Sequence, residues 1–424
     1  MTSTVFGWRD GWRYGLLGFG LAFVALPLYI VLPNYYARAF GVPLAALGGL
    51  LLGARLLDAV TDPLLGRWSD RLHARRPSAI LPWAALAAAL LALGFGLLFF
   101  PPALSTTWLL VWAGLCLMLT YAGYSALSIL HQSWGARLGG DEVQRARVVA
   151  WREGMGLLGV VLASVAPFTL GMANTTVLFV VALALGWWAW TSARKPPAAT
   201  AQQNTLRANN HTSSVWLPFK RPAFRALLGV FVVNGIASAV PATLILFFVQ
   251  DRLQAAEAVQ PLFLGSYFLC AALSIPFWMK QVKRLGLART WGLGMLLSVA
   301  VFVLAAQLGT GDSTPFMLVC AASGVALGTD LALPAALLAG VIASCGDQGQ
   351  AEGAYFGWWN FATKLNLALA AGIALPALAW LGYTPGAQDA GALHTLTLAY
   401  CLLPCALKLL AASLLYFLII RKLP

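Results

Sequence analysis

Two aspartates one helical turn apart are the residues in this sequence best suited to chemistry. Asp58 and Asp62 lie four residues apart in the run GARLLDAVTDPLLG, with Thr61 between them. On an α-helix this spacing places both carboxylates on one face, and Thr61 falls close to the same stripe. Carboxylate and hydroxyl oxygens are hard ligands that suit Na⁺, and two neighbouring carboxylates can instead share a proton. The pattern therefore predicts a site for Na⁺ or H⁺.

A simpler interpretation of these charges stays open. Asp62 would begin the polar loop after the helix, and Asp58 would pair with Arg55. Lys364 bears on the choice because it lies deep in the apolar stretch WWNFATKLNLALAAG, where a lysine needs a carboxylate partner. We expect Asp58 or Asp62 to be that partner, so that a cation would compete for the pair. The alternative is a lysine that extends its ammonium to the membrane surface.

Polar side chains elsewhere in apolar stretches predict a substrate cavity. The segment TYAGYSALSILHQSWGARLG carries polar groups at i, i+4 and i+7, which places them on one helix face. His131 in this segment could titrate near neutral pH, or it could be a satisfied packing residue. Arg152 could meet a substrate directly or form an ion pair with Glu153. The candidate substrate contacts are Tyr29, Tyr121, Tyr124, Ser125, Ser128, Trp151, Arg152, Asn234, Trp359 and Asn360.

The composition requires these residues to be positioned by helices in a lipid bilayer. The chain has 424 residues, of which 60% are hydrophobic and 10% are charged. Soluble domains carry about 25% charged residues, so this chain is too poor in charge to cover a water-exposed surface. The net charge of +13 comes from short basic clusters between apolar blocks. That distribution is typical of membrane proteins and excludes a nucleic-acid-binding face.

Twelve apolar stretches predict an all-α membrane protein with twelve transmembrane helices. They cover residues 13–38, 44–64, 78–100, 107–135, 147–170, 174–193, 222–249, 258–279, 288–309, 314–344, 352–383 and 390–420. Lys and Arg concentrate in alternate loops, whereas residues 101–106, 172–175, 309–314 and 382–392 contain none. This asymmetry predicts a multi-pass protein of the inner membrane with both termini in the cytoplasm.

A polar stretch from Ser192 to Ser214 divides the twelve expected helices into six and six. We therefore expect an N-terminal half over residues 1–193, a cytoplasmic linker over 194–221 and a C-terminal half over 222–424. Each half has a basic loop after its second helix, GRWSDRLHARR in the first and KQVKRLGLAR in the second. Two six-helix halves form the major facilitator fold, with a small-molecule substrate bound between them near the midplane.

Three segments resemble the signature segments of the glycoside–pentoside–hexuronide:cation symporters, the melibiose permease group of the major facilitator superfamily. They are ARLLDAVTDPLLGRWSDR, DEVQRARVVAWREG and AEGAYFGWWNFATKL, and the likeness runs essentially end to end. In that family two aspartates bind the coupling cation; they match Asp58 and Asp62, with Thr61 as the polar ligand between them. Arg152 and Lys364 match the family's arginine and lysine. The resemblance implies alternating-access symport driven by Na⁺ or H⁺, with no other cofactor.

Departures from the family pattern concern the cargo and the ion. Ala22 and Tyr121 stand where melibiose-type permeases have aspartates that hold galactoside hydroxyls, which implies a sugar-like solute that is not a galactoside. Met118 stands where the family has a threonine of the cation site, and Thr120 lies two residues away as the nearest candidate. The choice between Na⁺ and H⁺ therefore stays open.

The loop after the second expected helix predicts a gate. Gly66, Arg67, Asp70 and Arg71 belong to it, and Asp70 should pair with a helix end or a basic residue.

Two functions other than cation-coupled symport of a sugar-like solute stay open. A cavity poor in carboxylates and rich in aromatic residues would suit a lysophospholipid or another amphiphile. A non-transporting membrane scaffold is the second. We do not expect an enzyme, since no nucleophile–base pair or metal cluster has usable spacing, and we expect a monomer.

Overall fold

The protein is a chain of long helices. Its computed structural model describes residues 6–42, 44–103, 105–196, 214–256, 258–383 and 386–422, and no strand occurs among them. The first six expected spans correspond to α1 (Trp8–Phe23) with α2 (Leu32–Phe40), then α3 (Leu44–Arg75), α4 (Ile80–Phe99), α5 (Thr106–Arg137), α6 (Glu142–Thr169) and α7 (Gly171–Thr191). A π-helical segment, Pro27–Val31, separates α1 from α2.

The second six expected spans are helical as well. They correspond to α9 (Pro222–Phe247), α10 (Gln260–Leu285), α11 (Leu287–Phe302), α12 (Ser313–Ser344), α13 (Glu352–Trp380), and α14 (Ala390–Thr397) with α15 (Leu403–Leu418). A π-helical segment, Leu398–Leu402, joins α14 to α15. The all-α architecture predicted from the sequence is confirmed.

Nine helices of the described chain are long and apolar enough to cross a membrane. They do not include the segments 8–40, 44–75 and 352–380, which hold the other three expected spans. α3 contains Arg55, Asp58 and Asp62, and α13 contains Lys364. Charges at mid-length lower the apolar character of α3 and α13, and a charge near a helix centre opposes insertion into lipid.

The chain forms two compact units. Unit 1 comprises Met1–Lys220 and Ala339–Phe361, and unit 2 comprises Arg221–Leu338 and Ala362–Pro424. The first break falls within the expected linker over 194–221, of which residues 197–213 lie outside the described residues. Residues 339–361, which the expected division places in the C-terminal half, pack with unit 1. α13 therefore contributes its first ten residues to unit 1 and the remainder to unit 2.

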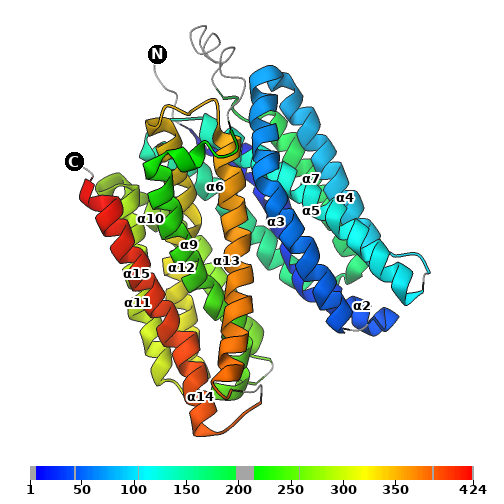
Figure 1. Cartoon of the computed structure of the whole chain (residues 1–424), viewed down its shortest axis with the longest axis vertical. Helices are drawn as coiled ribbons and strands as arrows, with labels where there is room; N and C mark the ends of the chain where they lie inside the picture. Colours follow the sequence, from blue (N-terminus) through cyan, green and yellow to red (C-terminus); the bar gives the residue numbers. More distant parts are fainter. Residues whose placement is uncertain are drawn as a thin grey trace. The chain divides into compact units, whose positions relative to one another are not determined.

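Close helix contacts order each unit. In unit 1, α1 packs against α6 and α7. Also in this unit, α4 packs against α5 and α7, and α3 packs against α5 (Figure 1). The contact of α1 with α6 requires a glycine, because a Cβ on Gly15 would lie 2.6 Å from the backbone oxygen of Trp151. In unit 2, α15 packs against α9 and α11, and α10 packs against α11.

Candidate functional site

The paired carboxylates lie on α3, one turn apart and shielded from solvent. Asp58 is 7% exposed and Asp62 is 0% exposed. Ser125 of α5 donates a hydrogen bond from Oγ to Asp58 Oδ1 at 2.7 Å. Thr61 is on the same helix and donates from its hydroxyl to the backbone oxygen of Asp58 at 2.8 Å. Two buried carboxylates with neighbouring hydroxyl oxygens can hold a small hard cation or a shared proton.

The hydroxyl of α5 that reaches Asp58 differs from the one the sequence suggested. Thr120 is fully buried, and its Oγ1 donates to the backbone oxygen of Cys116 at 2.7 Å. It packs against α4, since a Cβ on Gly94 would lie 2.5 Å from this Oγ1. Ser125, which the sequence pattern placed among substrate contacts, makes the bond to Asp58 instead. Ser125 lies five residues after Thr120, and the sequence pattern does not indicate that its hydroxyl bonds to Asp58.

The remaining polar groups of α5 are mostly buried. Tyr121 is 5% exposed, and Ser128 is 6% exposed and accepts a hydrogen bond from Gln132 at 2.9 Å. Tyr124 is half-buried. His131 is fully buried, with its Nε2 2.9 Å from the backbone oxygen of Tyr14 and its ring stacked on the Tyr14 ring. The packing interpretation of His131 therefore fits the structure better than a role as an exposed proton acceptor.

Arg152 and Glu153 form the ion pair that the sequence suggested. Arg152 donates from Nε and Nη2 to Oε1 of Glu153 at 2.9 and 2.6 Å, and it is 8% exposed. The neighbouring Trp151 lies against α1, since a Cβ on Gly11 would lie 2.5 Å from Cδ1 of its ring and closer still to two other ring atoms. Both candidate substrate contacts of α6 thus lie in the contact between α1 and α6.

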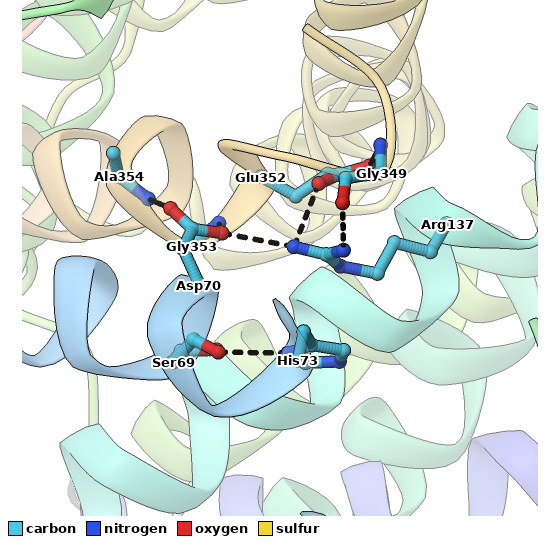
Figure 2. A network of polar contacts seen from close by, with 8 residues as sticks. All are labelled: Ser69, Asp70, His73, Arg137, Gly349, Glu352, Gly353 and Ala354. Atoms are coloured by element: carbon cyan, nitrogen blue, oxygen red, sulfur yellow. Dashed lines mark hydrogen bonds and ion pairs between the residues drawn. The ribbon is translucent and has the colours of Figure 1, made fainter. Parts of the chain in front are cut away.

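A buried polar cluster joins the end of α3, the end of α5 and the start of α13, all within unit 1 (Figure 2). Asp70 accepts hydrogen bonds from the backbone N–H groups of Gly353 and Ala354, each at 2.7 Å. Arg137 donates to Asp70 Oδ1 at 2.9 Å and lies 2.8 Å from Glu352 Oε2. We call this cluster of Asp70, Arg137, Glu352, Gly353 and Ala354 the latch.

The latch combines two carboxylates with one guanidinium and a helix end. The side chains of Asp70, Arg137 and Glu352 are 2%, 6% and 0% exposed. The N-terminal N–H groups of α13 carry partial positive charge, which favours the carboxylate bound to them. Burial raises the pKa of Asp70 to about 7, and Glu352 acts in the same direction, whereas Arg137 and the two N–H groups oppose the rise.

Glycines bring the latch helices into direct backbone contact. A Cβ on Gly66 of α3 would lie 2.7 Å from the carbonyl carbon of Gly353 and closer still to its oxygen. One turn along, a Cβ on Gly357 would lie 2.6 Å from the backbone oxygen of Asp62. The backbone beside the carboxylates of α3 is therefore in contact with the first turns of α13. Of the other expected loop residues, Arg67 is partly exposed and Arg71 is exposed.

The other candidates are spread over both units. Trp359 is buried and Asn360 is half-buried in the part of α13 that belongs to unit 1. Lys364 is half-buried and belongs to unit 2, whereas Arg55 is half-buried on α3 in unit 1. The expected pairing of Lys364 with Asp58 or Asp62 stays a prediction. The side chain of Tyr29 lies outside the described residues.

Sequence reasoning missed a charged cluster in unit 2. Lys408 of α15 forms an ion pair with Asp330 of α12, and both bond to Asn234 of α9. The sequence predicts a substrate contact for Asn234. Asp330 and Lys408 lie inside expected spans, as Lys364 does, so the rule that singled out Lys364 would also have found them. Arg137 and Glu352 were missed because they flank spans, where charges are ordinary.

Comparison with known proteins identifies the family. The family model for MFS/sugar transport proteins matches residues 11–422. The chain is 26% identical over 432 residues to "Uncharacterized symporter YjmB" of Bacillus subtilis, covering 96% of this chain and 92% of that protein. It is 25% identical to the isoprimeverose transporter of Lactiplantibacillus pentosus, covering 94% of this chain and 85% of that protein.

Solved structures agree on the fold. A bacterial homologue of the iron transporter ferroportin in the outward-facing state matches with a TM-score of 0.65 and 18% identity, covering 96% of this chain and 98% of that chain. At this identity the likeness shows the fold alone. Neither the lipid-carrier nor the scaffold alternative gains support from the comparisons. The named symporters among the relatives confirm the resemblance to the cation symporter group. The chain belongs to the MFS/sugar transport protein family, and it is a multi-pass membrane transporter and not an enzyme.

Proposed function

We propose that this transporter is a cation-coupled symporter of a sugar-like solute, with the coupling cation bound at Asp58 and Asp62. The observation that carries the proposal is the pair of buried carboxylates on one face of α3, one of them bonded to Ser125. A carboxylate inside a membrane is costly unless a cation or proton compensates it. Such a pair is suited to coupling, because the charge of the site changes as a cation binds and dissociates.

The donor set fits either of two ions. Na⁺ would use the carboxylate oxygens together with the hydroxyl oxygens of Ser125 and Thr61. A proton would be held between Asp58 and Asp62, because two close carboxylates favour a single shared proton. Lys364, matched by resemblance to a family lysine, would then respond to the charge at this site. Thr120 supports the site only indirectly, through the packing of α5 on α4.

The cargo proposed is a sugar or glycoside other than a galactoside. One relative is named an isoprimeverose transporter, and the family model describes sugar transport. The positions that match the two galactoside-binding aspartates hold Ala22 and Tyr121, and Tyr121 is buried. Neither side chain can accept two hydrogen bonds from sugar hydroxyls as a carboxylate can. Half-buried Tyr124 and Asn360 remain candidates for substrate contact.

The latch is proposed as the gate on the cytoplasmic side. This assignment follows from the positive-inside distribution, which also puts both termini in the cytoplasm. Because the latch consists of charge-assisted hydrogen bonds and a close backbone contact, it can form and break as a discrete element. Opening it would leave the N-terminal N–H groups of α13 to bind water. The protein would complete its cycle as a monomer in the inner membrane.

Uptake by proteoliposomes tests the coupling. Radiolabelled isoprimeverose is the first probe and lactose the contrasting galactoside, with an imposed Na⁺ or proton gradient. Asp58→Asn and Asp62→Asn should abolish gradient-driven accumulation. Asp389→Asn is the matched control: Asp389 caps α14 through a bond to the N–H of Ala392, and asparagine caps helices equally well. Gradient-driven uptake that survives in Asp58→Asn would refute the coupling.

A measurement that needs no substrate also tests whether Na⁺ or H⁺ is the coupling ion. A cation bound only by the folded protein raises its melting temperature. Wild-type protein in detergent should melt higher in NaCl than in choline chloride if Na⁺ is the coupling ion, and Asp58→Asn should lose this difference. If H⁺ is the ion, NaCl and choline chloride should give the same melting temperature, and a proton gradient alone should drive uptake.

A further inference from the structure

A second charged cluster lies within unit 2 and is centred on the ammonium group of Lys408. Its Nζ donates to Oδ1 of Asn234 at 2.8 Å, to Oγ of Ser238 at 3.1 Å, and to the carboxylate of Asp330. The Lys408 side chain is 7% exposed and that of Asp330 is 15% exposed. We call these four residues the Lys408 cage.

The cage is built by three helices and held from outside by a fourth. Trp291 of α11 is fully buried and donates from Nε1 to Asp330 Oδ1 at 2.8 Å. Asn234 donates from Nδ2 to the same oxygen at 3.1 Å. These two bonds orient the carboxylate through the oxygen that does not face the ammonium. The orientation of the Asp330 carboxylate therefore depends in part on Trp291 and Asn234, and not on Lys408 alone.

The chemistry of the cage is that of a site for a monovalent cation. An ammonium group has three N–H donors and no acceptor, and each donor here has one oxygen partner. The partners are a carboxylate, an amide carbonyl and a hydroxyl, which are the hard oxygen ligands that small cations prefer. We propose that α9, α12 and α15 form a monovalent-cation site in unit 2 whose permanent occupant is the tethered ammonium of Lys408.

The tethered occupant fixes the charge of this site. One carboxylate and one ammonium leave it electrically neutral, so it has no need of an ion from solution. The proposal is independent of the coupling role of Asp58 and Asp62, because it concerns other residues in the other unit.

A plain structural tie between helices predicts something different. If Lys408 only joins α15 to α12, its removal leaves a damaged contact that no dissolved ion repairs. If the oxygens form a cation site, removal of the tether leaves a negatively charged cage that a free cation can enter. Truncating one partner of a buried ion pair is strongly destabilising because the other charge stays buried. A bound cation would reverse that loss.

The test measures melting temperatures of Lys408→Ala in detergent, in ammonium, sodium or choline chloride at equal ionic strength. Ammonium or sodium should raise the melting temperature by about 2 °C or more over choline, and the effect should saturate. The matched control is the double variant Lys408→Ala/Asp330→Asn, which keeps Asp58 and Asp62 but lacks the cage carboxylate. Its response to the ions should equal that of the wild type.

Equal responses in the single and the double variant would overturn the proposal. Lys408→Ala could be too unstable to purify. In that case the comparison uses the fraction of fusion-tagged protein that elutes as a single species after extraction in ammonium or in choline chloride. A higher fraction in ammonium, absent in the double variant, supports the cage. The same fraction in both salts refutes it.

Discussion

Replacement of Gly66 by alanine tests the latch through its closest backbone contact. A Cβ at this position would lie 2.7 Å from the carbonyl carbon of Gly353, whereas nonbonded carbons are comfortable at about 3.5–4.0 Å. The start of α13 would have to move away from α3 by about 1 Å to relieve the overlap. Neither side of the contact can yield by a side-chain rotation, because the clash is with backbone.

The displacement would break the hydrogen bonds that close the latch. Asp70 binds the N–H groups of Gly353 and Ala354 at 2.7 Å each, and a shift of about 1 Å takes both beyond hydrogen-bond distance. A hydrogen bond to a charged group contributes about 1.5–3 kcal/mol, so the closed latch would lose about 3 kcal/mol or more. The gain in helix propensity from Gly to Ala is only about 0.5–1 kcal/mol. The equilibrium constant for closing the latch should therefore fall by a factor of about 30 or more.

The accessibility of a cysteine at position 351 reports on the latch. Ala351 is 0% exposed, so Ala351→Cys in a background without the six native cysteines should react slowly with a membrane-permeant maleimide. Adding Gly66→Ala should raise the labelling rate. Gly53→Ala on the same helix is the control, since nothing lies within 4 Å of a Cβ there. Equal labelling rates in the Gly66 and Gly53 variants would refute the contact.

Three further predictions concern single side chains. Ser125→Ala removes the hydroxyl that binds Asp58 and should raise the cation concentration for half-maximal uptake by about 5-fold, from a loss of about 1 kcal/mol; an unchanged value would exclude Ser125 from the site. Arg137→Met leaves the carboxylates of Asp70 and Glu352 buried together, so the melting temperature should fall sharply, and addition of Glu352→Gln should restore part of it. Because the pKa of Asp70 is raised from 3.8 to about 7, folding favours its protonated form. The melting temperature should therefore fall as pH rises through this window, and Asp70→Asn should remove that part of the slope.

The sequence predicted the helices well because long apolar stretches have few alternatives in a membrane. It was less accurate on where helices end. The second expected span was 44–64, yet α3 continues to Arg75. Apolar character marks the part of a helix in lipid, whereas the hydrogen-bonded helix can continue into the polar region. That extension places Asp70 on a helix and in line with Gly66, one turn before it.

Site residues were predictable where their partners lie on the same helix. Helical periodicity alone put Asp58 and Asp62 on one face, and adjacency suggested the pair of Arg152 with Glu153. Partners on different helices could not be predicted from periodicity or adjacency. Ser125 meets Asp58 across 67 residues of sequence. Such a pairing depends on helix rotation and depth, which side-chain packing determines and periodicity does not.

The buried ion pair of unit 2 contains a cation that belongs to the chain, and this restricts where ion coupling can occur. Asp330 is paired with the ammonium group of Lys408, which is part of the chain and cannot dissociate from the protein. Asp58 and Asp62 lie together on α3, and the matching residues in the family bind an ion that is exchanged in each cycle. A gradient can perform work only through an ion that binds and dissociates. Changes at the Lys408 cage should therefore alter the stability of the protein and leave its ion stoichiometry intact, whereas changes at Asp58 or Asp62 should alter the coupling itself.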